Sequence, residues 1–330
     1  MSTNGRAPTG RIVYFEAPGE VSVRTERITP RDGEELVRSQ IIGISHGTEM
    51  LFYRGPFPTG QLLEARDSVS GAAGYPLAYG YMNVGRRTDG SRVFAFAPHQ
   101  ELFAAPPEDL LPLPEGIEPD DAVLYPSIET ALQIVHDAAP LLGERVLVCG
   151  LGVIGLLVVE LLRRGLHEVI ATDPVASRRD RAAELGCRAL DPASPTAAQE
   201  IRDAADGARP DIAINTSARG EALQLGLDAL AHEGRAVEAS WYGESRVNLD
   251  LGASFHRRRL TIRASQVSNL NPAMQPRWTR ARRTAVAWRL VGELRPSRYI
   301  THRFPLDDAA AAYELIATHP ERVLQVVLVP

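Results

Sequence analysis

The chain has 330 residues, of which 44% are hydrophobic and 23% charged, a composition that excludes a disordered, collagen-like or disulfide-framework protein. The net charge of −5 and the absence of a basic block argue against nucleic-acid or acidic-membrane partners. All 36 cationic residues are arginine, which excludes a catalytic lysine. With two cysteines, a polar N-terminus and no long apolar stretch, we expect a soluble, cytoplasmic protein.

The first third of the chain is predicted to be rich in β-strands. Strands are expected at residues 11–17, 21–24, 36–44 and 92–97, separated by segments rich in glycine and proline. A proline-rich stretch over residues 106–119 then leads out of this β region.

After about residue 122, strand-like runs alternate with helical patterns. The predicted strands are 145–149, 168–172, 188–190, 211–215, 235–240 and 260–264, and the predicted helices are 152–165, 177–185 and 221–231. Six strands alternating with helices predict a doubly wound parallel sheet, the α/β Rossmann fold. The tail adds helices over 280–293 and 307–318, the latter N-capped by Asp307 or Asp308, and a strand over 321–329.

A glycine-rich turn follows the first strand of this α/β region. Residues 150–155 read Gly-Leu-Gly-Val-Ile-Gly, after a predicted strand and at the start of a predicted helix, as a dinucleotide-binding turn requires. Gly150 permits the tight turn, Gly152 lets the backbone approach a pyrophosphate, and Gly155 lets helix and strand pack closely. Backbone amides at the helix start, around Val153 and Ile154, are then expected to bind the phosphates.

The second predicted strand of the region ends at Asp173. An acidic residue there accepts hydrogen bonds from ribose hydroxyls and repels a 2′-phosphate, which favours NAD over NADP. Arg178 and Arg179 argue the other way, because an arginine nearby could accept the phosphate. The alternative interpretation is a glycine-rich turn in a nucleotide-free α/β protein.

Three further stretches carry a family resemblance. They are residues 43–55 (GISHGTEMLFYRG), 75–86 (YPLAYGYMNVGR) and 304–316 (FPLDDAAAAYELI). Together with the glycine turn, they make nearly the whole chain resemble the medium-chain dehydrogenase/reductase superfamily. The first two look most like bacteriochlorophyllide dehydrogenase and a group of bacterial proteins labelled zinc-type alcohol dehydrogenases.

This resemblance implies a domain organisation and an assembly. A β-rich, GroES-like catalytic domain is expected over residues 1–126 and 272–330, and an NAD-binding Rossmann domain over 127–271, with a cleft between them. The resemblance also implies a homodimer or tetramer that joins the Rossmann sheets at their edge, for which 260–264 is the candidate strand.

The resemblance breaks at the zinc ligands. Zinc members of the superfamily bind the catalytic metal through a cysteine, a Gly-His-Glu motif and a further Cys or Glu. Here the first position is Ser45, or His46 if aligned without a gap, residues 80–82 read Gly-Tyr-Met, and the last position falls near Tyr125. Tyrosine and methionine are poor zinc ligands, and the four-cysteine structural lobe is also missing, so we expect no zinc.

Hydroxyl groups are the candidates for the proton transfer that zinc would otherwise assist. Thr48 matches the family residue that contacts the reacting oxygen, and its hydroxyl could pass a proton to His46, Glu49 or water. Tyr81, at a vacated ligand position, is a feasible proton donor to an alkoxide. The alternatives are that Thr48 caps a helix, that Tyr81 only fills space, and that His46, Glu49 and a distant histidine such as His99 form another metal site.

Further residues are assigned to the cofactor by the resemblance. Thr130 matches the residue that touches the nicotinamide face, and Trp241 follows the fifth sheet strand, where family backbones hold the carboxamide. Ser217 is assigned to the same site. Glu129 is interpreted either as a buried acid near the cofactor or as an ordinary acid of a first helical turn.

We therefore expect a zinc-independent, NAD(H)-dependent oxidoreductase that interconverts a secondary alcohol and a ketone. The resemblance suggests a small specialised metabolite as substrate, with a polyhydroxylated one as an option, and NADP(H) is not excluded as cofactor. Two alternatives stay open: a zinc-free, NADPH-dependent enoyl or quinone (C=C) reductase, and a non-catalytic dinucleotide-binding sensor.

Overall fold

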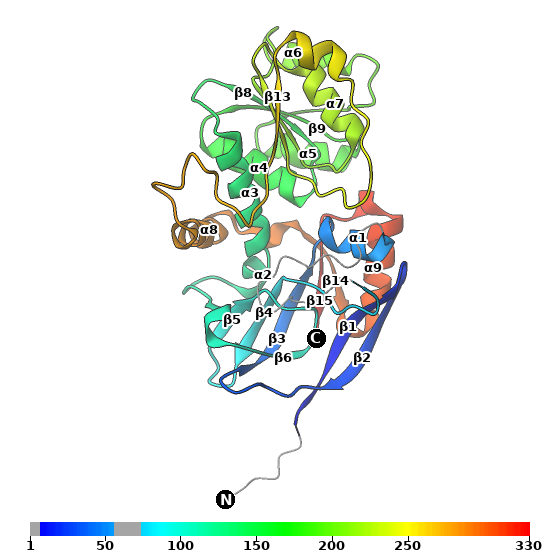
Figure 1. Ribbon diagram of the computed structural model, residues 1–330, viewed down its shortest axis with the longest axis vertical. Coiled ribbons are helices and arrows are strands. Elements are labelled where there is room, and N and C mark those ends of the chain that lie inside the picture. The colour runs from blue at the N-terminus through cyan, green and yellow to red at the C-terminus, as the bar shows by residue number, and fades with distance from the viewer. Residues whose placement is uncertain (1–6, 56–73) are drawn as a thin grey trace, which may run out of the picture. The chain divides into compact units, whose positions relative to one another are not determined.

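The computed structural model describes residues 7–55 and 74–330, which divide into two compact units (Figure 1). The first unit comprises residues 1–126 and 288–330, and the second comprises residues 127–287. The sequence places the second boundary at 271/272 instead. Residues 272–287 group with the second unit because they are tied into it, as where Arg283 donates to the side chain of Gln133 at 2.7 Å.

The second unit is built on a six-stranded sheet with the order β10-β9-β8-β11-β12-β13, in which all neighbours are parallel. Its strands are β8 (Arg145–Cys149), β9 (Glu168–Thr172), β10 (Arg188–Leu190), β11 (Ile212–Asn215), β12 (Arg235–Glu238) and β13 (Thr261–Ala264). The order and the parallel pairing are those of the predicted doubly wound fold. The predicted fifth strand extended to residue 240, whereas β12 ends at Glu238.

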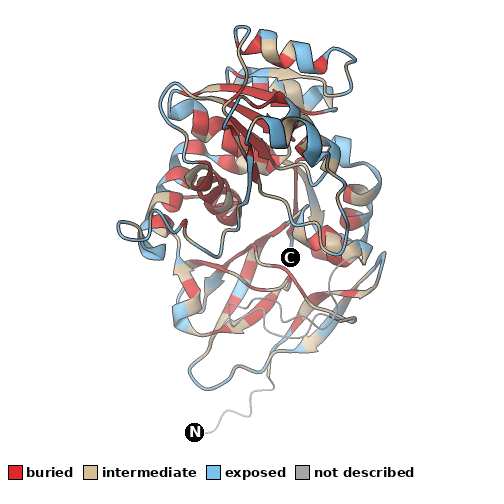
Figure 2. Cartoon of the chain, turned by 45° about the horizontal axis from the view of Figure 1, so that its top comes forward, coloured by how far each residue is buried: buried red, intermediate tan, exposed pale blue. Residues whose placement is uncertain are grey.

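Helices cover both faces of this sheet. Those that alternate with its strands are α4 (Val153–Arg164), α5 (Ala176–Glu184), α6 (Ala197–Ala204) and α7 (Gly220–Ala229). Helix α3 (Tyr125–Ala138) precedes β8, and α8 (Arg280–Leu294) follows β13 and crosses the boundary at residues 287/288. Because crossovers between parallel strands are right-handed, α4 and α5 pack on one face and α6 and α7 on the other, and each pair is in contact. The central strands are therefore buried on both sides, and they appear red in Figure 2.

The strand order reverses between β8 and β11. In open parallel sheets, ligands bind beyond the carboxyl ends of the strands at such a switch point. The glycine turn follows β8 directly, so the sequence motif and the topology select the same edge of the sheet. Strand β13 forms one edge of the sheet, and its four residues are all exposed.

The first unit contains a mainly antiparallel sheet with the order β14-β15-β3-β4-β5-β7, in which β6 also pairs with β3. Its strands are β3 (Glu35–Ile44), β4 (Asn83–Arg87), β5 (Arg92–Ala95), β6 (Leu102–Ala105), β7 (Leu110–Pro112), β14 (Ile300–Pro305) and β15 (Gln325–Val329). A separate hairpin joins β1 (Thr9–Ala17) and β2 (Glu20–Arg27). The helices of this unit are α1 (Thr48–Arg54), α2 (Pro119–Ala122) and α9 (Ala309–Thr318).

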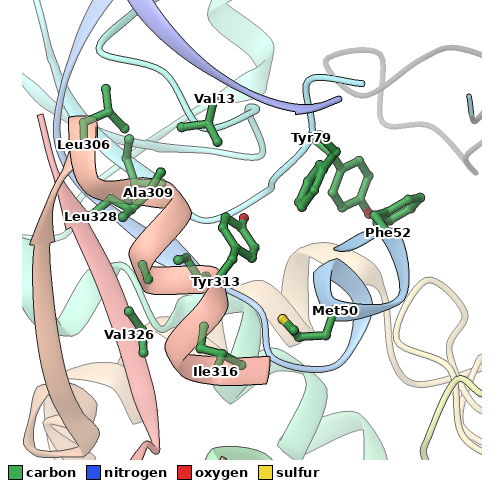
Figure 3. Packing of buried hydrophobic residues seen from close by; sticks show 14 of the residues in the cluster. Val13, Met50, Phe52, Tyr79, Leu306, Ala309, Tyr313, Ile316, Val326 and Leu328 are labelled. Atoms are coloured by element: carbon green, nitrogen blue, oxygen red, sulfur yellow. The ribbon is translucent and has the colours of Figure 1, made fainter. Parts of the chain in front are cut away.

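A hydrophobic cluster holds α1 and α9 against the strands of the first unit (Figure 3). Tyr313 of α9 lies in this cluster, with its ring edge-on to Phe15 at 5.1 Å and stacked on Tyr53 at 5.7 Å. The ring of Phe52 on α1 lies 4.4 Å from that of Tyr79. These contacts fix the helix that carries Glu49 relative to the loop that carries Tyr81.

The start of α9 corrects one expectation about capping. Asp308 occupies the N-cap position, but its side chain makes no capping hydrogen bond. A 3-10 turn over Leu306–Asp308 precedes the helix, and the carboxylate of Asp307 instead pairs with Arg11 at 2.7 Å. In residues 7–55 and 74–330, no helix is both long and apolar enough to cross a membrane.

Candidate active site

The glycine turn after β8 has the geometry that the motif predicts. Gly150 has φ +98°, and a Cβ there would fall 2.9 Å from the backbone of Ser217. A Cβ on Gly155 would fall 1.9 Å from the carbonyl oxygen of Gly150, so no side chain fits at that position. A Cβ on Gly152, at the N-terminus of α4, would meet nothing within 4 Å. The fold therefore requires the outer two glycines, and the middle one leaves open space where a phosphate would approach the helix.

Asp173 lies beside this turn and is buried. Its two carboxylate oxygens accept hydrogen bonds from the backbone amides of Leu151 at 2.7 Å and Val175 at 2.8 Å. Each carboxylate oxygen can accept a second hydrogen bond, so the group can also receive ribose hydroxyls. The same carboxylate ties the second strand to the glycine turn.

The two nearby arginines differ in their contacts. Arg179 donates to the carbonyl oxygens of Asp173 and Pro174 at 2.8 and 2.9 Å, and it also pairs with Asp191. Arg178 has a guanidinium nitrogen 3.7 Å from the Asp173 carboxylate. Of the two, Arg178 is the one whose guanidinium lies near the Asp173 carboxylate, whereas Arg179 bonds backbone carbonyl groups of the loop.

A polar network not identified from the sequence lies at the carboxyl ends of β11 and β12. The amide nitrogen of Asn215 donates to Glu238 at 2.7 Å and to the hydroxyl of Tyr242 at 3.1 Å, while its oxygen accepts from Ser217 Oγ at 2.7 Å. Tyr242 also donates to Glu238 at 3.0 Å. Burial raises the pKa of Tyr242, and the charge of Glu238 raises it further, so this hydroxyl keeps its proton.

This network positions two residues assigned to the cofactor. Ser217 is bound through it to β11, and Trp241, 46% exposed, lies between Ser240 and Tyr242, which both bond Glu238. A polar residue at the last position of each of two neighbouring parallel strands was the sequence signal that could have identified Asn215 and Glu238.

Two further candidate residues, Glu129 and Thr130, are neighbours on α3 but have different surroundings. Glu129 is buried and forms an ion pair with Arg283 at 3.2 Å, while Arg283 also donates to Gln133. Glu129 is therefore a buried acid held by a structural ion pair rather than a solvent-facing helix acid. Thr130, the next residue, is only half-buried, and its side chain stays a candidate for cofactor contact.

In the first unit, three hydroxyl side chains lie together. Ser45, Thr48 and Tyr81 are each half-buried, and the Tyr81 hydroxyl donates to Ser45 Oγ at 2.5 Å. Burial raises the pKa of Tyr81 to about 12; its hydrogen bonds with Ser45 and Thr48 lower the pKa, and the charge of Glu49 raises it. Tyr81 therefore holds its proton at neutral pH and can act as an acid.

A fully buried cluster lies behind these hydroxyls. Glu49 accepts a hydrogen bond from the Ser45 amide at 2.8 Å and another from the Tyr313 hydroxyl at 2.5 Å, and it lies 2.7 Å from His99 Nε2. Glu49, His99 and Tyr313 are completely inaccessible to solvent. Glu49 was a sequence candidate, but Tyr313 was not, because nothing near it in the sequence indicates a polar role.

The geometry also bears on two alternatives from the sequence. Gly47, not Thr48, occupies the N-cap of α1, and no side chain caps that helix. Of the three residues weighed for another metal site, Glu49 and His99 are adjacent, with His99 Nε2 2.7 Å from the Glu49 carboxylate. In the part of the chain that the structure describes, no three His, Cys, Asp or Glu side chains form a group that could hold a metal ion.

The residues at the family's zinc positions do not fit zinc. Ser45 and Tyr81 are neutral hydroxyls bonded to each other, and a phenol with so high a pKa is a poor ligand. Tyr125 is buried with its ring stacked on Trp288 at 4.5 Å and packed near Phe94. We therefore derive no step through a metal ion.

The chain is similar to known dehydrogenases in sequence and in fold. The family model for zinc-binding dehydrogenases matches residues 153–285, which lie within the second unit and do not include the zinc-ligand positions. The D-guloside 3-dehydrogenase of Escherichia coli K12 is 29% identical over 218 residues, covering 64% of this chain and 62% of that protein. These matches make the chain similar to dehydrogenases of the medium-chain dehydrogenase/reductase superfamily.

Solved structures of superfamily proteins share the fold along the whole chain. The short chain alcohol dehydrogenase RspB from Escherichia coli CFT073, complexed with NADH, has a TM-score of 0.79 at 19% identity, covering 98% of this chain and 99% of that one. A putative zinc-binding dehydrogenase from Sinorhizobium meliloti 1021, bound to NADP, has a TM-score of 0.78 at 20% identity, covering 98% and 100%. The match spans less than two thirds of the D-guloside 3-dehydrogenase, so the activity of that protein does not by itself give the activity of this chain.

Proposed function

We propose that this chain is a nicotinamide-dependent oxidoreductase that interconverts a secondary alcohol and a ketone, with NAD(H) as cofactor and without zinc. The observation that carries the proposal is the protonated Tyr81 hydroxyl, which bonds Ser45 at the position where zinc members hold the metal. Reduction of a ketone needs a proton donor at the developing alkoxide, and these hydroxyls provide one without a metal.

The residues of the second unit hold the cofactor in this proposal. The N-terminus of α4 and the open space at Gly152 receive the pyrophosphate, and Asp173 accepts the ribose hydroxyls. Thr130, Ser217 and Trp241 contact the nicotinamide half. When bound, the cofactor supplies or accepts the hydride, while the protein orients the reactants and moves the proton.

In the first unit, Tyr81 is the source of the proton and Thr48 is a second hydroxyl beside it. In the oxidation direction the same groups accept the proton that the alcohol loses. Reduction starts from the neutral phenol, in agreement with the raised pKa of Tyr81, whereas oxidation requires Tyr81 to release its proton to water before the site takes up the proton of the alcohol.

NAD(H) is proposed over NADP(H) because Asp173 places a carboxylate where a 2′-phosphate would lie. Arg178, 3.7 Å away, reduces this repulsion without replacing the acid. We therefore expect NADPH to bind more weakly than NADH, and we expect Arg178 rather than Arg179 to account for the binding that remains.

The proposed substrate is a small hydroxylated metabolite, and the proposed assembly is a homodimer or tetramer. A sugar-derivative dehydrogenase among the relatives and a proton-donating hydroxyl site favour a hydroxylated substrate. The exposed edge strand β13, with Ile262 37% exposed, supports pairing of two sheets. Sedimentation of a monomer at micromolar concentration would argue against that assembly.

The test of the function is a fluorescence titration with NADH and NADPH, followed by turnover on matched saturated ketones, alcohols and enones. We expect tighter binding of NADH and turnover of a ketone or alcohol. Turnover of an enone with NADPH, and of no saturated ketone, would replace the proposal by a C=C reductase. Binding without turnover of any member of a broad panel would instead favour a dinucleotide sensor.

A further inference from the structure

A carboxylate sealed inside the first unit has no role in the proposed function as it stands. Glu49 accepts hydrogen bonds from the Ser45 amide and the Tyr313 hydroxyl, and it contacts His99. The side chains of Glu49, His99 and Tyr313 are inaccessible to solvent. Burial of a carboxylate is unfavourable unless its oxygens are well satisfied, so this arrangement needs an explanation.

The surroundings of His99 indicate which groups carry protons. Its Nδ1 is buried without a hydrogen-bond partner, and it faces Gly80, where a Cβ would fall 2.4 Å away. A buried N–H without an acceptor is less favourable than a bare imidazole lone pair, so the hydrogen is assigned to Nε2, which donates to Glu49. The Glu49 carboxyl group then accepts hydrogen bonds from the Ser45 amide, Tyr313 and His99.

This carboxylate locks the position of Ser45. The Ser45 amide donates to Glu49 Oε1 at 2.8 Å, and the Glu49 amide donates back to the Ser45 carbonyl at 3.2 Å. The reciprocal pair fixes the backbone at the start of α1 in the way that a capping box does. Tyr313 and His99 hold the carboxylate from the other side, so the position of Ser45 Oγ depends on residues that never reach the surface.

The hydrogen-bond pattern of Ser45 gives the direction of proton transfer. A tyrosine hydroxyl has one hydrogen, and that of Tyr81 is donated to Ser45 Oγ at 2.5 Å. Ser45 Oγ therefore acts as an acceptor toward Tyr81, and its own hydrogen remains available to a different acceptor. Ser45 is half-buried, whereas Glu49 behind it is not accessible, so that acceptor lies on the accessible side.

We propose, building on the proposed function, that Ser45 is the catalytic residue that hands the proton to the substrate oxygen and that Tyr81 restores it. In ketone reduction, hydride from NADH forms the new C–H bond and the carbonyl π pair moves to oxygen. That oxygen takes the hydrogen of Ser45 Oγ, Ser45 Oγ takes the hydrogen of Tyr81, and Tyr81 regains a proton from water. Glu49, His99 and Tyr313 are positioning residues that hold Ser45 in line.

The first test compares Ser45→Ala with Ser39→Ala. Ser39 is a matched control, because it lies on the adjoining strand β3 and its hydroxyl donates to the Gln100 carbonyl away from these groups. We expect Ser45→Ala to lower kcat about 100-fold with NADH affinity unchanged, and Ser45→Thr to restore at least a tenth of the activity. If Ser45→Ala does not fold, Ser45→Gly is used with the same readouts.

The second test measures the proton inventory, the dependence of kcat on the fraction of heavy water. Two hydrogens in motion predict a curved dependence in the unmodified protein and a different, single-proton dependence in Ser45→Ala. A purely structural role for Ser45 would lower activity without changing the shape of this curve.

The positioning cluster is tested with Tyr313→Phe against Tyr79→Phe. Both changes remove the hydroxyl of a tyrosine in the same hydrophobic cluster, and of the two hydroxyls that of Tyr313 bonds Glu49. We expect Tyr313→Phe to lower kcat about tenfold, with KM and NADH affinity unchanged, and Tyr79→Phe to leave kcat within twofold.

The outcomes separate this inference from the function on which it rests. If Tyr81→Phe abolishes ketone reduction while Ser45→Ala keeps kcat within threefold, the inference is overturned and the proposed function stands. If the unmodified protein binds NADH but reduces no ketone, the proposed function itself fails.

Discussion

The cofactor turn of the second unit and the hydroxyl site of the first unit are assembled from the chain in different ways. At the turn, the glycines lie within residues 150–155, and the Leu151 amide bonds Asp173 only 22 positions away. At the hydroxyl site, Tyr81 and Ser45 are 36 positions apart, and Glu49 is 264 positions from its partner Tyr313. The turn is therefore specified by a local motif, whereas the hydroxyl site exists only once the core of the first unit has packed.

This difference has consequences for mutation. A change at Gly150 or Gly155 of the turn acts through backbone geometry, because neither position has room for a side chain. A change at the hydroxyl site acts through single hydrogen bonds, because the participating side chains come from several elements that are distant in the sequence. The predictions below use this contrast, in order of decreasing effect.

The largest effect is expected at the turn itself. Gly155→Ala would place a methyl group 1.9 Å from the Gly150 carbonyl oxygen, and we expect it to lower the free energy of unfolding by about 3 kcal/mol or more. Gly152→Ala meets nothing within 4 Å, so it should keep stability and lose at least tenfold in NADH affinity. Urea unfolding and NADH titration measure both, with Gly252→Ala, another helix-start glycine of the second unit, as control.

Equal loss of stability in Gly152→Ala and Gly155→Ala would contradict the separate roles of the two glycines. Normal NADH binding by Gly152→Ala would show that the open space there does not receive the pyrophosphate.

The next effect concerns the hydroxyl site. Tyr81→Phe removes the proton source, and we expect kcat for ketone reduction to fall about 100- to 1,000-fold while NADH affinity stays within twofold. Thermal unfolding should change little, because the ring remains to pack. Unchanged turnover in this variant would remove Tyr81 from the mechanism and reduce it to a residue that fills space.

A smaller effect is expected at the cofactor-selecting acid. Asp173→Asn keeps the size of the side chain but loses the charge, and we expect about tenfold weaker NADH binding together with improved relative binding of NADPH. Adding Arg178→Ala should cancel the improvement with NADPH, whereas Arg179→Ala should leave it in place. The ratio of NADH to NADPH affinity, measured by fluorescence, checks this order, and an unchanged ratio in Asp173→Asn would oppose it.

The smallest effect lies in the second unit but away from the glycine motif. Burial lowers the pKa of His136 to about 4, and the nearby charges of Arg283 and Arg282 add to this while Asp137 opposes it. Because the unfolded chain binds the proton more readily, this stabilising contribution is complete above about pH 6.5 and is lost as the pH falls toward 4.

Between pH 6.5 and 4, titration of His136 is expected to lower the free energy of unfolding by about 1 kcal/mol, a figure reduced for partial exposure to solvent. We expect this decrease to be absent in His136→Gln. Urea unfolding of both proteins at several pH values gives the comparison. Identical pH dependence in the two proteins would show that His136 titrates normally.

The accuracy of the predicted strands and helices differs between the two units in the same way. The strands β8, β9 and β11 are continuous apolar runs and were predicted within a residue, because burial on both faces of a parallel sheet leaves little other choice. Short strands such as β6 and β7 were not predicted, because their pairing partners in the first unit are distant in sequence. Helix α6 was also missed, since its segment AAQEIRDA is only eight residues long and half of them are polar.

In the candidate site, residues marked by local spacing were named from the sequence, whereas residues that depend on tertiary contacts were mostly not. The glycine turn and Asp173 follow from spacing, and Tyr81 follows from a departure from the family's ligand pattern. His99 and Tyr313 acquire their roles from contacts across elements, and no local pattern marks them, whereas Asn215 and Glu238 are marked only as polar residues at the ends of neighbouring strands.

The central claim is that hydroxyl groups do here what zinc does in zinc members of the superfamily. The most direct measurement is ketone reduction by NADH with protein treated with a strong chelator, its zinc content determined on the same sample, before and after adding zinc. The account predicts full turnover at negligible zinc content and no gain on addition. Activity that disappears with the metal and returns in proportion to added zinc would contradict it.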